Sequence, residues 1–165
     1  MKFSEEKFNH DLVEFVRKYN TSHDDNFKLI LAPENPSALQ SRTHSAELRT
    51  FLPLNSTPCV RLLSIVYNKI YGCPQLFFNF YSENGQLIVI DKIRQALMTP
   101  DNENFWSFIS QNEHPDKGIA FYNIHPCKTV EFFDELEENV DSNTILYWLS
   151  VFGAFLGLNL EAIAS

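Results

Sequence analysis

The spacing of apolar residues near the N-terminus predicts an amphipathic helix. Apolar side chains recur every three or four positions from Phe8 to Tyr19, which places them along one face of a helix. Ser4 is a favoured N-cap residue, and Glu5 and Glu6 are acidic residues that suit a first helical turn. We therefore expect the chain to open with a helix that packs one face on a core.

Short apolar runs between turn residues predict strands in the next part of the chain. Residues 27–32 form one such run. Residues 33–58 hold several prolines, which predicts a long loop with a short strand or helical turn near residues 48–54. Residues 59–71 and 75–81 are rich in β-branched and aromatic side chains, with a Gly-Cys-Pro break between them, and predict two neighbouring strands.

An Asn-Gly pair predicts a hairpin after the second of these strands. Asn84 and Gly85 are flanked by residues 80–81 and by the apolar run 87–90, the pattern of a two-residue hairpin turn. The three consecutive strands would then form an antiparallel meander.

Helical patterns dominate the C-terminal part of the chain. Residues 92–112 are helical or irregular, and the short apolar run 118–124 leads into the tripeptide His-Pro-Cys. Thr129 can cap a helix that follows, and Asp141 or Ser142 can cap a closing helix that is apolar on nearly all sides. Helices at both ends of an antiparallel sheet are typical of the α+β class.

The composition favours one domain, residues 1–165, built around a single core. The net charge of -8 would repel a phosphate backbone, so the expected partners are proteins and not nucleic acids or anionic membranes. The most apolar run, residues 145–158, is shorter than the ~20 residues that span a bilayer, so no transmembrane segment is expected. The N-terminus lacks the pattern of a secretory signal.

Among the three cysteines, Cys127 is the best candidate nucleophile. Their number and spacing indicate reduced thiols in a cytoplasmic setting, and the absence of phosphate-loop, dinucleotide and zinc motifs predicts no cofactor and no metal. Cys127 lies outside the predicted elements, just before a helix start. A helix N-terminus and Lys128 favour its thiolate, whereas the acidic stretch 131–138 opposes it. Alternatively Cys127, like Cys59 and Cys73, is a small buried side chain.

Three further residues could support chemistry at this cysteine. His125 could form a local hydrogen bond that orients the segment, or be an ordinary half-exposed histidine. Tyr71 could pack on the sheet edge or reach a reacting amine with its hydroxyl. Asn123 could donate a hydrogen bond to a tetrahedral oxyanion, or simply occupy a turn.

The sequence around Cys127 resembles the active-site motif of the autophagy conjugating enzymes. FYNIHPCKT carries their His-Pro-Cys element, KIYGCPQLFFNFY is similar to their strand, turn and strand, and TILYWLSVFGAFLGL is similar to their closing helix. His114-Pro115-Asp116 invites comparison with the His-Pro-Asn element of ordinary ubiquitin-conjugating enzymes. Its third residue and its spacing to Cys127 differ from that element, so a plain turn is the better interpretation.

The resemblance implies a ubiquitin-conjugating (UBC-like) fold and a transfer in two steps. An activating enzyme, autophagy-related protein seven, would pass the modifier, autophagy-related protein twelve, to Cys127 as a thioester. The modifier would then move to a lysine of autophagy-related protein five, a step required for autophagosome formation. Tyr71 matches a tyrosine of the family that positions the acceptor. Transient recruitment of this cytoplasmic enzyme to the autophagosome assembly site stays open.

Three other functions are compatible with the sequence. A sister type in the family delivers its modifier to phosphatidylethanolamine, but that type carries long insertions and the shortness of this chain argues against it. A thiol hydrolase would need a distant histidine, such as His10, His23 or His44, to converge on Cys127. A non-catalytic module would use the sheet and the closing helix only to bind a protein partner.

Overall fold

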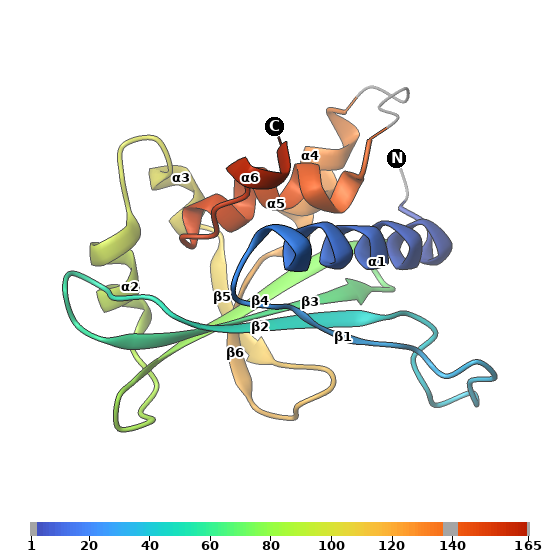
Figure 1. Ribbon diagram of the computed structural model, residues 1–165, viewed down its shortest axis with the longest axis horizontal. Helices are drawn as coiled ribbons and strands as arrows, with labels where there is room; N and C mark the ends of the chain where they lie inside the picture. Colours follow the sequence, from blue (N-terminus) through green and yellow to red (C-terminus); the bar gives the residue numbers. More distant parts are fainter. Residues whose placement is uncertain (1–2, 137–141, 165) are drawn as a thin grey trace.

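An antiparallel sheet with a layer of helices on one side forms the body of the protein (Figure 1). The computed structural model describes residues 3–136 and 142–164. Within them the helices are α1 (Glu5–Ser22), α2 (Ile90–Leu97), α3 (Glu103–Trp106), α4 (Pro126–Asp134), α5 (Thr144–Phe155) and α6 (Glu161–Ala164). The strands are β1 (Lys28–Ile30), β2 (Ser45–Phe51), β3 (Cys59–Asn68), β4 (Cys73–Ser82), β5 (Ile109–Glu113) and β6 (Ala120–Ile124).

The strand order is β1-β2-β3-β4-β6-β5, and every neighbouring pair is antiparallel. The first four strands form a meander, and β6 then pairs with β4 before β5 closes the edge. Helices α1, α4, α5 and α6 lie over one face of the sheet (Figure 1). The predicted α+β class and the two strands predicted at residues 59–71 and 75–81 are therefore confirmed.

The prediction that residues 87–90 form the third strand of a meander is wrong. Asn84 and Gly85 do form the turn, with Gly85 at a φ of 78°. Residues 87–90, however, make a single bridge to β4 and then enter α2 at Ile90. The neighbour of β4 on that side of the sheet is instead β6, which comes from a later part of the chain.

Strand β2 begins and ends three residues before the short strand or helical turn predicted near residues 48–54. Its sequence, SAELRTF, is largely polar, and its burial alternates. Ala46 and Leu48 are buried on the core face, while the whole strand runs beside β3 from the pair Ala46 and Ile65 to the pair Phe51 and Val60. A polar strand of this kind is stabilised by its neighbour and by two buried side chains rather than by its own propensity.

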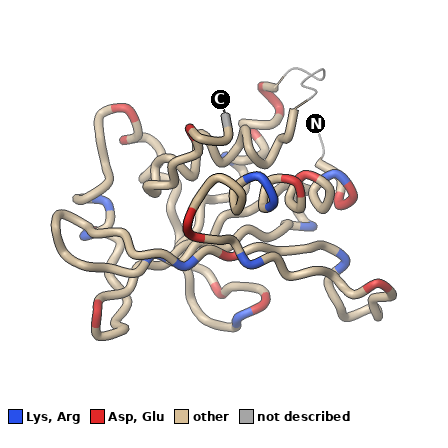
Figure 2. Tube along the Cα trace, in the orientation of Figure 1, with Lys and Arg blue, Asp and Glu red and all other residues tan. Residues whose placement is uncertain are grey.

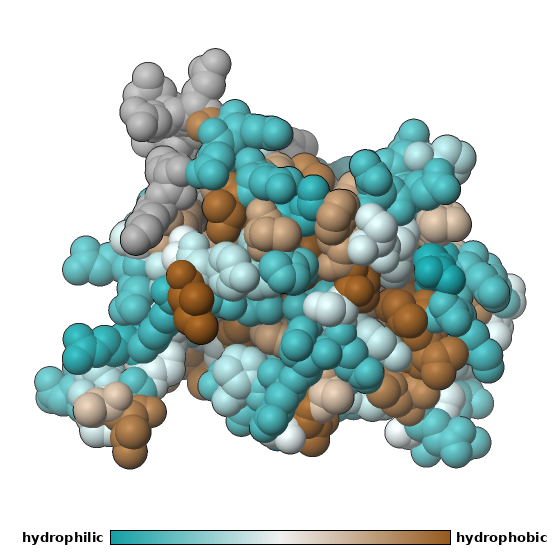
Figure 3. All heavy atoms as spheres, turned by 180° about the vertical axis from the view of Figure 1, so that it is seen from behind, coloured by the Kyte–Doolittle hydropathy of each residue, from teal (hydrophilic) through white to brown (hydrophobic). Residues whose placement is uncertain are grey.

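Alternation along the central strands separates the helix-covered face from the open face. Phe78 and Phe80 of β4 point into the main core, which also contains Trp148 of α5. Phe77 points the other way and joins a smaller cluster with Phe121. Successive side chains on a strand point to opposite faces, so the nearly continuous apolar run of β4 contributes side chains to the main core and to the cluster on the open face. Seen from behind, hydrophobic side chains form separate patches among hydrophilic ones (Figure 3).

Acidic and basic residues are interspersed along the outer face of α1 (Figure 2). This helix has two ion pairs at helical spacing, Lys18 with Glu14 and Lys7 with the buried Asp11. Such pairs contribute only a few tenths of a kcal/mol each, roughly 0.3–0.5.

None of the helices in the part of the chain that the structure describes has both the length and the apolar character of a membrane span.

A buried polar contact joins α1 to the start of α5. Asn143, not Ser142, caps α5, because its side chain accepts a hydrogen bond from the N–H of Leu146 at 3.0 Å; Asp141 lies outside the described residues. The Asp11 carboxylate accepts hydrogen bonds from the N–H and hydroxyl of Thr144, at 3.2 and 2.6 Å. Burial acts to raise the pKa of Asp11, but the hydrogen bonds from Thr144, Lys7 and His10 together prevail and hold it below its ordinary value.

Candidate active site

The candidate nucleophile lies in the first turn of α4, directly after β6. His125 is the N-cap residue and Pro126 takes the first helical position, where a missing N–H costs nothing. The His125 Nδ1 accepts a hydrogen bond from the backbone N–H of Cys127 at 3.1 Å, as an Asn or Asp cap does. The helix therefore starts earlier than predicted: Thr129 lies inside it, and Cys127 belongs to its first turn instead of preceding it.

Neighbouring strands hold this turn in place. The backbone N–H of His125 donates to the carbonyl of Phe108 at 2.9 Å, just before β5 begins. The thiol of Cys73, at the start of β4, lies 3.9 Å from the carbonyl oxygen of Pro126. Pro126 is buried and Cys127 is partly exposed, so the thiol lies at the surface on an anchored backbone.

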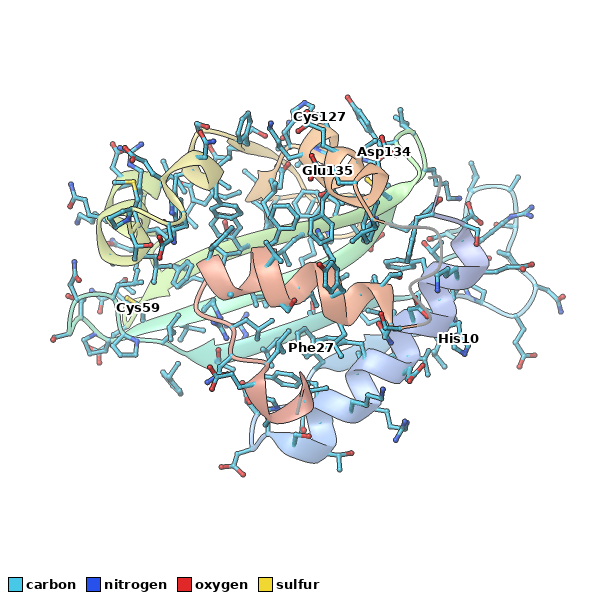
Figure 4. All side chains as sticks on the ribbon, turned by 90° about the horizontal axis from the view of Figure 1, so that it is seen from above. His10, Phe27, Cys59, Cys127, Asp134 and Glu135 are labelled. Carbon is cyan, nitrogen blue, oxygen red and sulfur yellow. The ribbon has the colours of Figure 1, made fainter. Side chains whose placement is uncertain are left out.

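The accessibility of the three cysteines differs sharply. Cys59 and Cys73 are buried, and burial raises the pKa of the Cys73 thiol to about 12. Cys59 also lies at the opposite end of the sheet from Cys127 (Figure 4). Among the three cysteines, only Cys127 combines access to a partner with a position in the first turn of a helix.

The charged residues beside Cys127 are paired with each other. The ammonium of Lys128 is 2.9 Å from the carboxylate of Glu131 and 3.9 Å from the centre of the Phe108 ring. Lys128 therefore presents a partly balanced charge to the thiol. Glu131 is the first residue of the acidic stretch that the sequence predicted to oppose the thiolate, and its nearest basic partner in the described contacts is this lysine.

Tyr71 and His125 meet although 53 residues lie between them in the sequence. Tyr71 lies in the turn between β3 and β4 and is 43% exposed. Its ring meets the His125 ring edge-on, with centroids 6.0 Å apart and an interplanar angle of 81°. The turn is held by Asn68, whose side-chain oxygen accepts a hydrogen bond from the Tyr71 N–H at 3.0 Å. Two of the three predicted supporting residues thus lie together at the start of α4.

Asn123 lies in β6 and not in a turn. It is buried beside Phe77 of β4, on the sheet face that the helices do not cover. Its amide nitrogen donates to Ser110 at 3.3 Å and to Asn112 at 2.9 Å. The role of oxyanion donor stays a prediction, and it would require Asn123 to exchange these bonds for a new one.

The His-Pro-Asp sequence forms a turn after β5, as expected. The buried Nδ1 of His114 accepts hydrogen bonds from the N–H groups of Asp116 and Lys117 at 3.1 and 3.3 Å. Its Nε2 therefore carries the proton and donates to the hydroxyl of Ser64 at 2.8 Å. No contact in the described part of the chain links this histidine to Cys127.

One group of potential metal ligands occurs among the described residues. It comprises His10, Asp11 and Glu14 on α1, with ligand atoms within 4.8 Å of one another. Asp11 already accepts hydrogen bonds from Thr144, and the group lies far from Cys127 (Figure 4). It offers nothing to the chemistry of the thiol.

A family model covers this whole region. Residues 23–162 match the model described as "Autophagocytosis associated protein, active-site domain", a range that contains Cys127. The chain belongs to this family. Its fold also resembles that of a solved structure, the "Crystal structure of Autophagic E2, Atg10", with a TM-score of 0.63 at 15% identity, over 95% of this chain and 98% of that one. The predicted UBC-like fold is therefore confirmed.

Relatives within the family carry two kinds of name. "Ubiquitin-like-conjugating enzyme ATG10" of Arabidopsis thaliana is 31% identical over 108 residues, and the human protein of that name is 31% identical over 105. Each match covers 58% of this chain and 48% of the relative, so the chain spans about half the length of these relatives. "Autophagy-related protein 3" of Dictyostelium discoideum is 25% identical over 105 residues, covering 61% of this chain and 30% of the relative.

Proposed function

We propose that this member of the family is a ubiquitin-like conjugating enzyme that carries its modifier as a thioester on Cys127. The observation that carries the proposal is the partly exposed Cys127 thiol in the first turn of α4, while Cys59 and Cys73 are buried. A carrier cysteine must be reached by two large partners in succession, and only this thiol is accessible.

The first step is a thioester exchange. The Cys127 thiolate attacks the carbonyl carbon of the modifier's terminal residue, which is bound as a thioester to the activating enzyme. A new carbon–sulfur bond forms, the old one breaks, and the activating enzyme leaves as a thiolate. The N-terminus of α4 supplies partial positive charge where negative charge resides on the attacking sulfur.

The second step is aminolysis by a lysine of the acceptor. The free amine attacks the thioester, an amide bond forms, Cys127 leaves as a thiolate, and the amine proton passes to a base or to water. In this proposal His125 orients Cys127 through its hydrogen bond to the Cys127 N–H, and Tyr71 helps to position the acceptor beside it. Asn123 remains the candidate oxyanion donor.

The proposed partners are those that the resemblance of the sequence motif to the family implies. The activating enzyme would be autophagy-related protein seven, the modifier autophagy-related protein twelve, and the acceptor autophagy-related protein five. Two relatives named ATG10, of Arabidopsis thaliana and human, are 31% identical and support this assignment, whereas the ATG10 and the autophagy-related protein 3 of Dictyostelium discoideum are both 25% identical and do not discriminate. The proposed location is the cytoplasm, with recruitment to the autophagosome assembly site.

A loading experiment tests the proposal. The protein is incubated with activating enzyme, modifier and ATP, and adducts are compared on reducing and non-reducing gels. We expect a reductant-sensitive adduct for the wild type, a reductant-stable ester for Cys127→Ser and none for Cys127→Ala. Cys59→Ala is the matched control and should load normally, because Cys59 is buried and distant.

The same experiment separates the other candidate functions. Absence of an adduct with any competent modifier would remove the carrier role and favour a protein-binding module. Transfer to phosphatidylethanolamine in vesicles, without transfer to a protein lysine, would favour the sister reaction. A thiol hydrolase would be favoured if the wild type hydrolysed the thioester faster than variants of His10, His23 and His44.

A further inference from the structure

A lysine lies next to the proposed carrier cysteine, which poses a chemical problem for a thioester enzyme. Lys128 directly follows Cys127 in the first turn of α4. A thioester on Cys127 is an activated acyl group, and a free amine held close to it can capture the acyl group, because proximity raises the rate of such reactions strongly. The modifier would then end on the enzyme itself.

Two contacts hold the Lys128 ammonium in a defined place. The nitrogen lies 3.9 Å from the centre of the Phe108 ring, inside the range of a cation–π contact. It also lies 2.9 Å from the carboxylate of Glu131, three residues later on α4. Both partners attract a positive charge, so together they hold the Lys128 nitrogen at this position.

The contacts also direct the Lys128 side chain away from that of Cys127. Consecutive residues on a helix project about 100° apart. Lys128 and Phe108 line a cavity of about 230 Å³ between α3, α5 and β6, together with Phe105 and Phe155, and Cys127 is not among the described residues that line it. The backbone of Phe108 is anchored beside α4, because its carbonyl accepts a hydrogen bond from the backbone N–H of His125 at 2.9 Å.

We propose that Phe108 and Glu131 act as a clamp that prevents transfer of the acyl group from Cys127 to Lys128. The unwanted reaction would be attack of the Lys128 amine on the thioester carbonyl, with formation of an isopeptide bond, loss of the Cys127 thiolate and release of one proton to solvent. The clamp lowers the rate of this reaction and keeps the thioester for the acceptor. The inference rests on the proposed function only in placing a thioester on Cys127.

Chemical loading tests the clamp without the activating enzyme. The folded protein is treated with a short peptide thioester that ends in glycine, and the conversion of reductant-sensitive into reductant-stable adduct is followed by mass spectrometry. We expect Phe108→Leu and Glu131→Gln each to speed self-transfer to Lys128 by about two- to fivefold. The double variant should show about tenfold faster transfer, if the two contacts are independent.

Matched variants control the experiment. Glu135→Gln removes an equal charge from the C-cap of α4, at the other end of the helix from Cys127, and should leave the rate unchanged. Lys128→Arg keeps the positive charge and cannot accept the acyl group, so it should abolish the stable adduct in every background. Equal self-transfer in wild type and clamp variants, or a stable adduct that survives Lys128→Arg, would overturn the proposal.

Competitive amine labelling provides a second measurement that needs no thioester. At low doses of acetic anhydride, Lys128 should react more slowly than the exposed Lys69 and Lys92, and Glu131→Gln should reduce that difference. Equal labelling of all three lysines in wild type would contradict the clamp. If enzymatic loading fails while clamp-dependent transfer persists after chemical loading, the proposed function fails and the clamp stands. If enzymatic loading succeeds while the clamp variants transfer at the wild-type rate, the proposed function stands and the clamp fails.

Discussion

The two His-Pro turns, at His114 and at His125, share one local geometry but differ in burial and in the side chains that surround them. In each, the histidine Nδ1 accepts the backbone N–H two residues later, at 3.1 Å in both cases. His114 is buried between Phe77 and Phe121 and donates its Nε2 proton to Ser64. His125 is exposed, starts a helix and touches only the ring of Tyr71 among aromatic partners in the described region.

The difference shows that the motif supplies a turn and the surroundings decide its use. At residues 114–116 the turn joins β5 to β6, and the side chain fills the open face of the sheet. At residues 125–127 the same turn leads into α4, and the residue that follows the proline is a partly exposed cysteine. We therefore expect changes at His114 to affect stability and changes at His125 to affect the transfer reaction.

Replacing His114 should have the largest effect on stability. His114→Ala removes a buried ring, leaves the Ser64 hydroxyl without its donor and deprives the Asp116 and Lys117 N–H groups of an acceptor. We expect a loss of about 2–4 kcal/mol in the free energy of unfolding, measured by urea denaturation. Ser64→Ala, which removes only one partner, should cost about 1 kcal/mol. A loss below that of Ser64→Ala would contradict a structural role for this histidine.

Replacing His125 should have a smaller effect on stability and a clear effect on the reaction. His125→Ala removes the cap of α4 at a cost of about 1 kcal/mol. We expect the rate of transfer from Cys127 to fall by about tenfold, because the first turn of α4 is no longer held. His125→Asn can accept the same N–H hydrogen bond and should restore most of the rate in single-turnover assays. If Asn and Ala variants are equally slow, the imidazole takes part in proton transfer and not in orientation.

Acid should lower the stability of the folded protein through His114, the buried histidine of the two His-Pro turns. Burial lowers the pKa of His114 below its ordinary value of 6.5, so in this window the folded protein binds fewer protons than the unfolded chain. The free energy of unfolding should therefore fall as the pH drops below about 6.5. Urea denaturation between pH 7.5 and pH 5, at about half-unit steps, measures this loss.

Two other groups control this pH experiment. Burial also lowers the pKa of His44, so part of the acid sensitivity should remain in His114→Ala and disappear only when His44 is replaced as well. The pKa of Asp11 lies below its ordinary value of 3.8, so its contribution is lost only in stronger acid. An unchanged slope in His114→Ala would show that His114 does not bind its proton differently in the two states.

Much of this arrangement could be predicted from the sequence, and the rest depends on contacts between distant segments. The opening helix and two central strands follow from local patterns, whereas the helix after the His-Pro pair was predicted to start later than it does. The pairing of β6 with β4 does not, because it joins segments more than 40 residues apart after the hairpin pattern at Asn84 had indicated a nearer partner. The Phe108 contacts with Lys128 and with the His125 backbone also have no local signal, because they join residues that are 20 and 17 positions apart in the sequence.

At the site, the sequence contains a signal for the position of Asn123 but none for the contact that Tyr71 makes. Alternation along the run 118–124 could have placed Asn123 on the face opposite the residues that enter the core, since Tyr122 and Ile124 are buried there. No local signal predicts that Tyr71, in a turn between β3 and β4, meets His125. Such a contact depends on the register of three strands and on the start of α4.

The smallest expected effect concerns Tyr71, the one aromatic partner of the exposed histidine. Tyr71→Phe keeps the edge-on ring contact with His125 and removes only the hydroxyl, whereas Tyr71→Ala removes both. If the ring orients His125, Tyr71→Ala should slow transfer by about two- to fivefold, the equivalent of roughly 0.5–1 kcal/mol, and Tyr71→Phe should change it less than twofold. The rates come from single-turnover transfer of a preloaded modifier. Equal losses in both variants would assign the effect to the hydroxyl, which then reaches the acceptor amine itself.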